Sequence, residues 1–288
     1  MPKLKRSLNT IYISERMQEQ LRRISQTAFT VVVAPMGYGK STAINWYING
    51  LDDKKNKVIR INIYSDSIPL FWNSVKNAFK VIDNEIDAFQ YPSDMESRII
   101  LIEHMRSAFD KLNEELYIFI DDFHLMKDAS AVSFICSLAY SLPENIHIIV
   151  ASRDRFLPAG EVMHFGKNLH KITAEHLKLN YTEINIYAKN CGINLENEQL
   201  ERLVKLSEGW FSAVYLNLRS YIQYGEMLED NDDIYESIMA ALIETASDEE
   251  KQFLFKMSIA DEFSVKMAKF ITENDKSENL LKSMTEKN

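Results

Sequence analysis

The residues best suited to chemistry lie in a short glycine-containing loop that follows an apolar run. Gly37 and Gly39 allow backbone angles at which successive N–H groups converge on a phosphate group. Lys40 is expected to reach the β- and γ-phosphates, Ser41 to ligate Mg²⁺ and Thr42 to contact an α-phosphate oxygen, at the start of a helix whose dipole favours anions. The run predicts a nucleoside-triphosphate site whose binding residues are Ala34, Pro35, Met36, Gly37, Tyr38, Gly39, Lys40, Ser41 and Thr42.

Two carboxylates follow another apolar run, Tyr117–Ile120. Asp121 is expected in the Mg²⁺ coordination shell, and Asp122 is expected to orient or polarise the attacking water. Paired acids at the end of a strand also occur in solvated turns, but the phosphate loop upstream favours the catalytic interpretation. We therefore predict Asp122 and Lys40 as catalytic residues, and Ser41 and Asp121 as metal ligands.

A third apolar run, Ile146–Ala151, ends in Ser152 and Arg153. At the carboxyl edge of a parallel sheet, Arg153 would point toward the nucleotide and could bind the γ-phosphate with two hydrogen bonds. The alternative is a surface arginine that pairs with Asp154. His124 is interpreted as a packed or solvated loop residue rather than as a γ-phosphate sensor.

The segments that must position these residues alternate in type through the first half of the chain. The strand-like runs are uniformly apolar, as strands buried on both faces of a sheet are. Between them, apolar residues recur at steps of three and four from Met95 to Leu112, which indicates a helix, with a capping box expected at Ser93–Glu96. Such alternation predicts βαβ units and a parallel sheet. The expected strands are Phe29–Ala34, Val58–Ile63, Tyr117–Ile120, Ile146–Ala151 and Leu169–Ile172.

From Tyr181 onward the pattern is helical, so an α/β domain is expected to be followed by all-α material. A further boundary is expected near residues 225–233, where the charge becomes strongly acidic. The three tryptophans sit among apolar helix residues and are predicted to be core. The expected helices are Thr182–Asn190, Glu196–Leu206, Ser212–Tyr224, Ile234–Thr245 and Ser247–Ser258, the last with a capping box at Ser247–Glu250.

Composition excludes several classes of protein. The 288 residues carry a formal net charge of −9, and 46% of them are hydrophobic, which is typical of a folded protein of about two domains. Two cysteines, Cys136 and Cys191, cannot form a disulfide framework or a Cys-based zinc site. No run is apolar enough for a signal peptide or a membrane span, so we expect a cytoplasmic protein without a membrane partner.

The motifs together resemble those of the LuxR-type large ATP-binding transcriptional regulators. The phosphate loop of that family typically reads Ala-Pro-Ala-Gly-Tyr-Gly-Lys-Thr-Thr, so Ala34 is normal for it, and Ser41 keeps the hydroxyl group of its threonine. The other matches are an Asp-Asp-Tyr/Phe-His-Leu segment, a Ser-Arg sensor and a Glu-Gly-Trp helix start. The matching segments, within a resemblance that runs from about Ile11 to the end, are Ala34–Thr42, Ser65–Trp72, Ile120–Leu125, Ala151–Arg153 and Glu208–Trp210.

The resemblance implies a signal-transduction ATPase with numerous domains (STAND). Its nucleotide-binding, helical and winged-helix domains would cover residues 1–175, 176–228 and 229–288, with the last one truncated because the chain stops within a helical pattern. The family binds ATP or ADP with Mg²⁺, and slow hydrolysis acts as a switch. Self-association in the ATP state, an inducer that is not identified, and DNA binding only through a C-terminal domain absent here are also implied.

Two further positions come from the resemblance. The segment Ile11–Arg16 resembles the one that lines the adenine pocket, with Arg16 as its expected contact. Phe211 stands where the family often has a proline in contact with adenine, and it is expected either to stack on the base or to leave that contact unmade.

The rival interpretation is a stand-alone P-loop enzyme, such as a kinase or an AAA-type ATPase, that acts on a partner or a small substrate. A kinase should carry an arginine-rich lid, and an AAA motor should carry an arginine finger and a pore loop. None of these is clear in the sequence. A third interpretation, a nucleotide-bound scaffold without turnover, shares every binding residue with the switch.

Overall fold

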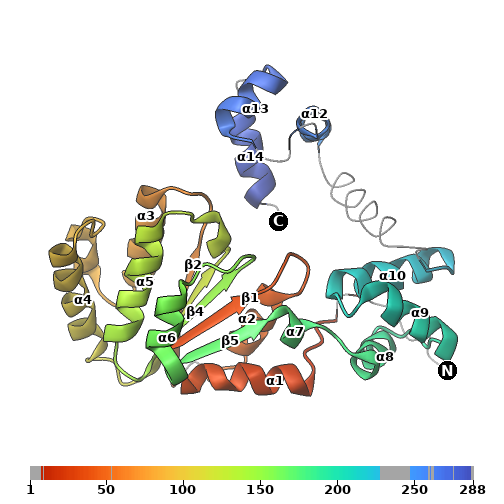
Figure 1. The fold of residues 1–288 in the computed structure, drawn as a ribbon, viewed down its shortest axis with the longest axis horizontal. Coiled ribbons are helices and arrows are strands. Elements are labelled where there is room, and N and C mark those ends of the chain that lie inside the picture. The colour runs from red at the N-terminus through yellow and green to blue at the C-terminus, as the bar shows by residue number, and fades with distance from the viewer. Residues whose placement is uncertain are drawn as a thin grey trace. The chain divides into compact units, whose positions relative to one another are not determined.

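The computed structural model describes residue 8 and residues 10–52, 54–227, 247–258, 260, 263–274 and 276–286 (Figure 1). It consists of two compact units, Met1–Leu218 and Arg219–Asn288, and each is described here by itself. The first unit carries every residue that the sequence singles out for chemistry.

A five-stranded, all-parallel sheet forms the centre of the first unit. Its order is β2-β3-β4-β1-β5, so β4 lies between the two strands that lead to the phosphate loop and to the paired carboxylates. Each strand expected from an apolar run is present, and its ends agree within two residues. The strands are β1 (Phe29–Val33), β2 (Asn56–Asn62), β3 (Glu115–Asp121), β4 (Ile146–Ser152) and β5 (Leu169–Thr173).

The register of the sheet brings three strand ends to one edge. Val33 of β1 pairs with Ser152 of β4, and Ile120 of β3 pairs with Val150 of β4. The phosphate loop, the paired carboxylates and Arg153 therefore leave the sheet at the same carboxyl edge, where open parallel sheets bind ligands.

Helices cover both faces of the sheet because alternate strand residues point to opposite sides. Ile118 and Ile120 of β3 join the core on one face, and Tyr117 and Phe119 join the core on the other. The first face is covered by α3 (Ile68–Phe79), α4 (Met95–Phe109), α5 (Ala129–Ser141) and α6 (Ala159–Phe165). The second face is covered by α1 (Glu15–Arg22), α2 (Lys40–Asn49) and α7 (Ala174–Leu177). The chain also forms short 3₁₀ turns, which include η1 (Arg23–Gln26), η2 (Asn84–Ala88), η3 (Phe123–Leu125) and η4 (Gly166–Asn168).

The expectations for α4 need two corrections. Its cap is Asp94 rather than Ser93, because the Asp94 carboxylate accepts the backbone N–H of Ser97 at 2.9 Å. The expected apolar stripe is buried only in its second half, since Met95 and Ile99 are 77% and 48% exposed. The first turn of α4 thus lies outside the core that its later turns join.

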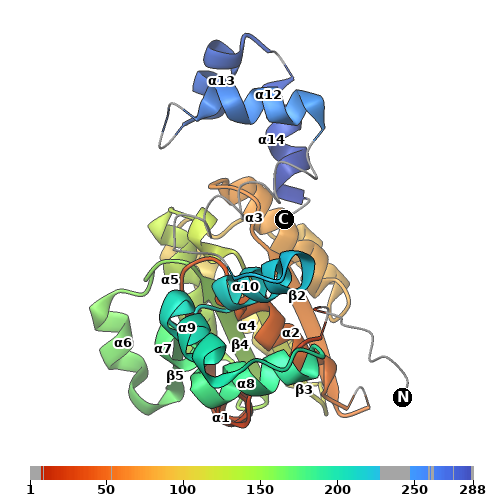
Figure 2. The ribbon, with the colours of Figure 1, turned by 90° about the vertical axis from the view of Figure 1, so that its right-hand side faces the viewer.

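Three helices follow the sheet: α8 (Tyr181–Asn190) and α9 (Asn197–Ser207) lie within the first unit, and α10 (Phe211–Tyr224) begins in it and extends past its end at Leu218. Figure 2 shows them grouped together in front of the sheet. All three agree with the sequence prediction within one residue. The turn between α9 and α10 requires Gly209, which has a φ of +78° and in which a Cβ would lie 2.4 Å from the Leu179 carbonyl oxygen.

The second unit is helical in its described part and contains α12 (Asp248–Met257), α13 (Val265–Thr272) and α14 (Ser277–Glu286). The capping box expected at Ser247–Glu250 is confirmed, with both reciprocal hydrogen bonds present. The helix expected at Ile234–Thr245 lies outside the described residues. No helix among the described residues is long and apolar enough to cross a membrane.

Candidate nucleotide-binding site

The phosphate loop connects β1 to α2 and has the backbone that the glycines predict. Gly37 and Gly39 have φ values of +79° and +77°, in the left-handed region that other residues rarely adopt. Lys40 begins α2, is 9% exposed, and donates from Nζ to the carbonyl oxygens of Ala34 and Pro35 at 2.7 and 3.1 Å. Burial, and then the positive charge of Arg153, lower the pKa of Lys40. An anion beside this buried ammonium group would offset both effects.

Ser41 and Asp121 meet across the carboxyl edge although they come from α2 and β3. The Ser41 hydroxyl lies close enough to the Asp121 carboxylate to lower its pKa, and the backbone N–H of Asp122 donates to Asp121 Oδ1 at 2.9 Å. Burial nevertheless raises the pKa of Asp121. A hydroxyl and a carboxylate are the hard oxygen donors that Mg²⁺ prefers, and a cation would compensate the buried charge. The two side chains therefore fit the metal that the sequence assigns to them.

Asp122 lies beyond the end of β3 with its side chain 52% exposed. Its φ of +54° turns the chain sharply into η3, and its Oδ1 lies 3.8 Å from His124 Nδ1. The His124 side chain is packed, only 10% exposed, and its Nδ1 has no hydrogen-bond partner among the described residues. Burial, followed by the charges of Arg153 and Lys40, lowers the pKa of His124 to about 4, so the ring is neutral at pH 7.

Arg153 follows β4 directly and is exposed. Its positive charge lowers the pKa of both Lys40 and His124. Within the described ranges, no ion pair joins Arg153 to Asp154, which was the alternative interpretation of this residue.

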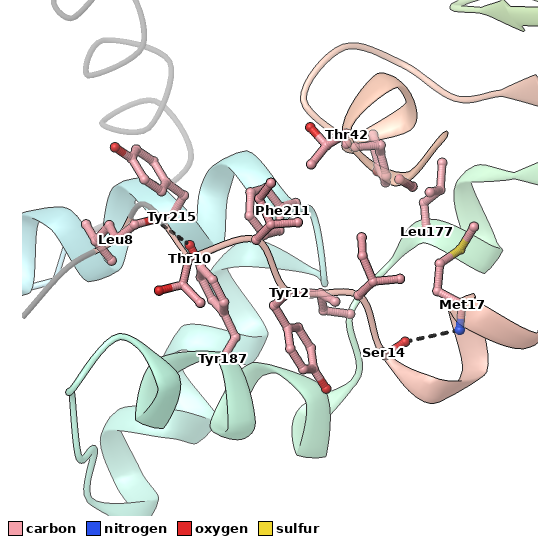
Figure 3. Close-up of a pocket in the computed structure, with 16 residues that line it drawn as sticks. Leu8, Thr10, Tyr12, Ser14, Met17, Thr42, Leu177, Tyr187, Phe211 and Tyr215 are labelled. Carbon is pink, nitrogen blue, oxygen red and sulfur yellow. Dashed lines mark hydrogen bonds between the residues drawn. The ribbon is translucent and has the colours of Figure 1, made fainter. Parts of the chain in front are cut away.

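A largely apolar pocket of about 210 Å³ lies directly beside the phosphate loop. Gly39 and Thr42 form its wall on the α/β side, and residues of α8 and α10 form the wall on the helical side. Figure 3 shows the segment with Thr10, Tyr12 and Ser14 running past Phe211 toward α1. Phe211, Tyr187 and Tyr12 give the pocket an aromatic lining, which suits a planar base.

Arg16 does not line this pocket, so the structure does not bring the expected adenine contact to it. Its guanidinium group lies 3.2 Å from each carboxylate oxygen of Glu183 and also donates to the backbone carbonyls of Glu175 and Lys178. The reason is electrostatic, because Glu183 is buried at the start of α8 and needs a positive partner. Neighbouring residues of the same segment, Tyr12 to Ser14, line the pocket instead.

Two contacts to the phosphate loop were missed by sequence reasoning. Trp210, expected in the core, donates from Nε1 to the Met36 carbonyl at 3.0 Å. Ser212 donates to the Gly37 carbonyl from its backbone N–H and from its hydroxyl, each at 3.1 Å. The Glu-Gly-Trp motif had drawn attention to Trp210. Because the motif lies far from the phosphate loop along the chain, the sequence did not indicate that the two are in contact. The core prediction is confirmed for Trp72, at 4% exposure, and wrong for Trp46, at 38%.

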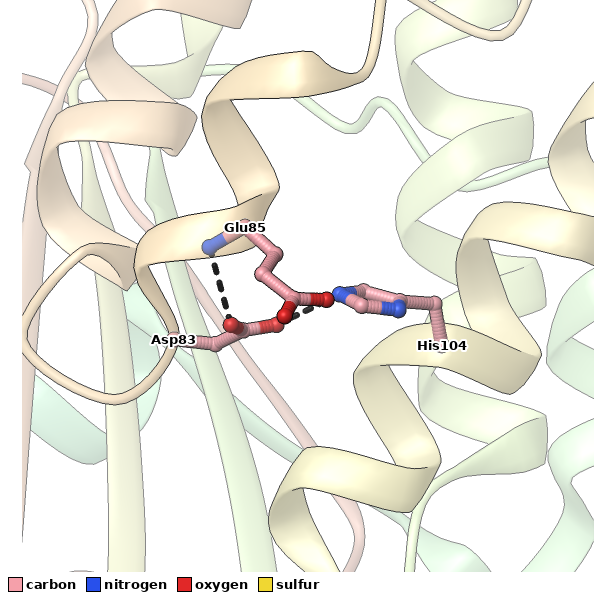
Figure 4. A group of neighbouring side chains, drawn as sticks. All are labelled: Asp83, Glu85 and His104. Carbon is pink, nitrogen blue, oxygen red and sulfur yellow. Dashed lines mark hydrogen bonds and ion pairs between the residues drawn. The ribbon is translucent and has the colours of Figure 1, made fainter.

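A second group of titratable side chains, Asp83, Glu85 and His104, also escaped sequence analysis (Figure 4). The potential ligand atoms lie within 4.8 Å of one another. Asp83 accepts the backbone N–H of Glu85 at 3.0 Å and contacts His104 Nε2 at 2.5 Å. The aspartate thus caps η2 and joins it to α4, which accounts for its approach to the histidine.

The chain was compared with known proteins. No protein-family model matches it. It is 20% identical to the HTH-type transcriptional regulator MalT of Vibrio parahaemolyticus over 96% of this chain and 32% of that protein. It is 24% identical to MalT of Yersinia enterocolitica over 72% of this chain and 23% of that protein. The chain is thus distantly similar in sequence to MalT. The resemblance to LuxR-type large ATP-binding regulators is thereby supported, and the chain spans no more than about a third of the length of these relatives.

Solved structures agree with this relationship at the level of the fold. The chain superposes with a TM-score of 0.58 and 18% identity on a STAND protein with a tetratricopeptide repeat sensor from Pyrococcus horikoshii, covering 98% of this chain and 40% of that one. A Walker-type ATPase of Pyrococcus abyssi gives a TM-score of 0.50 and 10% identity over 99% of both chains. The chain therefore has the α/β fold of P-loop ATPases, followed by helical segments.

Proposed function

We propose that this chain is the ATP-binding switch module of a bacterial transcriptional regulator, in which slow Mg²⁺-dependent hydrolysis controls self-association. The observation that carries the proposal is the buried Lys40, bonded within the phosphate loop at the sheet edge where β3 ends in Asp121. A hydroxyl at the start of α2, a carboxylate at the end of β3 and an ammonium group converge at the same sheet edge. Phosphoryl-transfer sites in P-loop proteins require this set of groups.

The phosphates are assigned to the phosphate loop. Lys40 would bind the β- and γ-phosphates, the backbone N–H groups of residues 34–39 would surround them, and Thr42 would contact the α-phosphate. Ser41 and Asp121 would hold Mg²⁺, which when bound neutralises the charge on the phosphate oxygens. The pocket beside the loop would take adenine, with Phe211 in place of the proline that the family often has.

Turnover is assigned to two residues at the neighbouring strand ends. Asp122 would orient the attacking water, for which its exposed carboxylate beyond β3 is suited. Arg153 would bind the γ-phosphate. The neutral, packed His124 ring adds no charge to this group of residues.

The domain assignment also belongs to this proposal. Residues 1–175 would form the nucleotide-binding domain, 176–228 the helical domain and 229–288 part of a winged-helix domain, with DNA bound only by a region outside these residues. Support comes from the relatives, which are HTH-type transcriptional regulators. An inducer that the chemistry of this chain does not identify would bias the ATP and ADP states, in a bacterial cytoplasm.

Lys40→Ala tests the nucleotide site. Because the variant lacks the buried ammonium group, titration calorimetry should detect no binding of ATP or ADP, whereas Lys54→Ala, which removes an exposed lysine, should bind like the wild type. Unchanged ATP affinity in Lys40→Ala would contradict the proposal. The nucleotide released when the purified wild type is denatured identifies the state in which the protein is isolated.

The molar mass of the protein in its two nucleotide states tests the proposed switch. Light scattering after size exclusion should give a larger particle with Mg²⁺ and a slowly hydrolysed ATP analogue than with ADP. The same mass in both states, together with fast turnover on an added acceptor, would favour a stand-alone P-loop enzyme instead.

A further inference from the structure

Four carbonyl groups of the phosphate loop, those of residues 34–37, accept hydrogen bonds from side chains or from the start of α10. Those of Ala34 and Pro35 accept hydrogen bonds from Lys40 Nζ. Those of Met36 and Gly37 accept hydrogen bonds from outside the α/β part of the unit, from residues at the start of α10. The phosphate loop is thus shaped in part by the helical segment.

The donors at the start of α10 are of two kinds. Trp210 uses its indole Nε1, 3.0 Å from the Met36 carbonyl oxygen. Ser212 uses its hydroxyl and its backbone N–H, both 3.1 Å from the Gly37 carbonyl oxygen. The Ser212 N–H lies in the first turn of α10, where backbone donors have no partner within the helix and the dipole attracts a carbonyl oxygen.

Holding a carbonyl group fixes the N–H group of the next residue. The peptide unit is planar and trans, so its C=O and N–H point in opposite directions. Bonds to the carbonyls of Met36 and Gly37 therefore turn the N–H groups of Gly37 and Tyr38 away from α10. These N–H groups belong to the stretch that phosphate loops use to surround an anion.

Packing shows how closely α10 approaches the phosphate loop. A Cβ at Gly37 would lie 2.4 Å from Ser212 Oγ and 2.6 Å from Trp210 Nε1, closer than such atoms can approach. At Gly39, by contrast, a Cβ would meet nothing within 4 Å. One side of the loop is therefore filled by α10 at Gly37, while the other glycine faces open space.

We propose that Trp210 and Ser212 are positioning residues of the phosphate site: by binding the carbonyls of Met36 and Gly37, they present the N–H groups of Gly37 and Tyr38 to the phosphates. The inference rests on the proposed nucleotide-binding function and adds a specific requirement to it. Affinity for the phosphate part of the ligand depends on the start of α10, whereas affinity for the base depends on Phe211 and the pocket.

The experiment separates these two parts by measuring ADP and adenosine affinities in the same variants. Trp210→Phe removes the indole donor and keeps an aromatic ring, and Ser212→Ala removes the hydroxyl donor and keeps the backbone bond. Each should weaken ADP binding by about fivefold, the usual effect of one hydrogen bond, and leave adenosine binding unchanged. Phe211→Ala should weaken both ligands by a similar factor.

Trp46→Phe and Ser74→Ala are matched controls, because both side chains lie on other helices and Ser74 bonds only to its own helix at Leu70. Each should bind ADP like the wild type. Circular dichroism and a melting curve establish that a variant is folded, and Ser212→Ala keeps the test valid if Trp210→Phe does not fold.

Three results would overturn the inference. If both variants bind ADP with wild-type affinity, the bonds to the loop carbonyls do not position the phosphate site. If they lose adenosine and ADP affinity equally, α10 acts on the pocket rather than on the loop. If the wild type binds neither ADP nor ATP, the proposed function itself is wrong, and the positioning role falls with it.

Discussion

The guanidinium group of Arg16 binds the Glu183 carboxylate through two hydrogen bonds of 3.2 Å, one from Nε and one from a terminal nitrogen. This pair connects α1, which packs against one face of the sheet, to the first turn of α8. Glu183 also accepts the backbone N–H of Asn180, so its carboxylate serves at once as a helix cap and as an ionic partner. The pair thus fixes the helical segment against the α/β part of the first unit.

Arg16→Ala should lower the free energy of unfolding by roughly 1–3 kcal/mol at pH 7, because it leaves a buried carboxylate with fewer partners. Burial alone would raise the pKa of Glu183, but the bonds from Arg16, Asn180 and Ser14 lower it. A lowered folded-state pKa stabilises the protein above the ordinary glutamate value of 4.5, and this stabilisation is lost as the pH falls below it.

Denaturant unfolding of the wild type and Arg16→Ala at several pH values measures this effect. The difference between them should be largest near neutral pH and should shrink as Glu183 becomes protonated. Arg22→Ala, which removes an exposed arginine from the same helix, should show neither the loss nor the pH dependence. A difference that stays constant from pH 7 to pH 3 would mean that the ion pair does not account for the loss.

Alanine at the two loop glycines should have unequal effects. Gly39→Ala meets only backbone strain, of about 1–2 kcal/mol, because its φ is +77° and the space around it is open. Gly37→Ala adds a clash with Ser212 and Trp210 and should destabilise the first unit more strongly. Melting temperatures of both variants test the order, with Gly160→Ala, which has open space and no positive φ, as the control expected to lose no stability.

Removing the Ser212 hydroxyl should recover part of the stability that Gly37→Ala loses. Gly37→Ala in a Ser212→Ala background should therefore cost less than in the wild type, since the hydroxyl 2.4 Å from the new methyl group is gone. Equal melting temperatures for Gly37→Ala and Gly39→Ala would show that α10 does not restrict the loop.

Local patterns were sufficient to predict the strands, the phosphate loop and the boundaries of α8, α9, α10 and α12. Each depends on short-range physics, such as an apolar run buried on both faces or a glycine that must take a positive φ. The register that gathers Asp121 and Arg153 at one edge follows from the parallel sheet. Those parts of the candidate site could be derived because strand ends converge whatever their distance along the chain.

Long-range contacts between polar groups could not be derived in the same way. Trp210 reaches Met36 across 174 positions, and Arg16 reaches Glu183 across 167. A tryptophan in an apolar helix context predicts burial, and nothing in its neighbours indicates that the indole N–H will find a loop carbonyl. The prediction for Trp46 failed for the same reason, since the composition around a residue does not say which face of α2 packs against the sheet.

Asp122→Asn should keep ATP binding and slow hydrolysis. Asparagine tolerates the left-handed φ of +54° at this position and preserves the shape of the side chain. Only the charge that would orient or polarise water is lost. The affinity for ATP in the ground state should therefore change little, while the transition state is stabilised less. Single-turnover hydrolysis and ATP affinity are measured together, with Asp110→Asn as an exposed aspartate control. Hydrolysis at the wild-type rate would remove Asp122 from the mechanism.

Arg153→Ala should narrow the preference for ATP over ADP. If the exposed guanidinium group beyond β4 binds the γ-phosphate, its loss costs the ATP state up to about 3 kcal/mol and leaves ADP nearly unaffected. A small gain in ADP affinity would agree with this expectation. Arg153 lowers the pKa of Lys40, so the loss of Arg153 favours the charged form of the Lys40 ammonium group.

The two affinities, measured by calorimetry in Mg²⁺, give the ratio directly. Arg155→Ala, two residues further along the same loop, is the matched control and should keep the wild-type ratio. Arg153→Lys separates charge from geometry, since a lysine supplies the charge without the two-pronged hydrogen bond and should recover only part of the preference. Equal losses for ATP and ADP in Arg153→Ala would place the arginine away from the γ-phosphate, because a contact with that group exists in one ligand and not in the other.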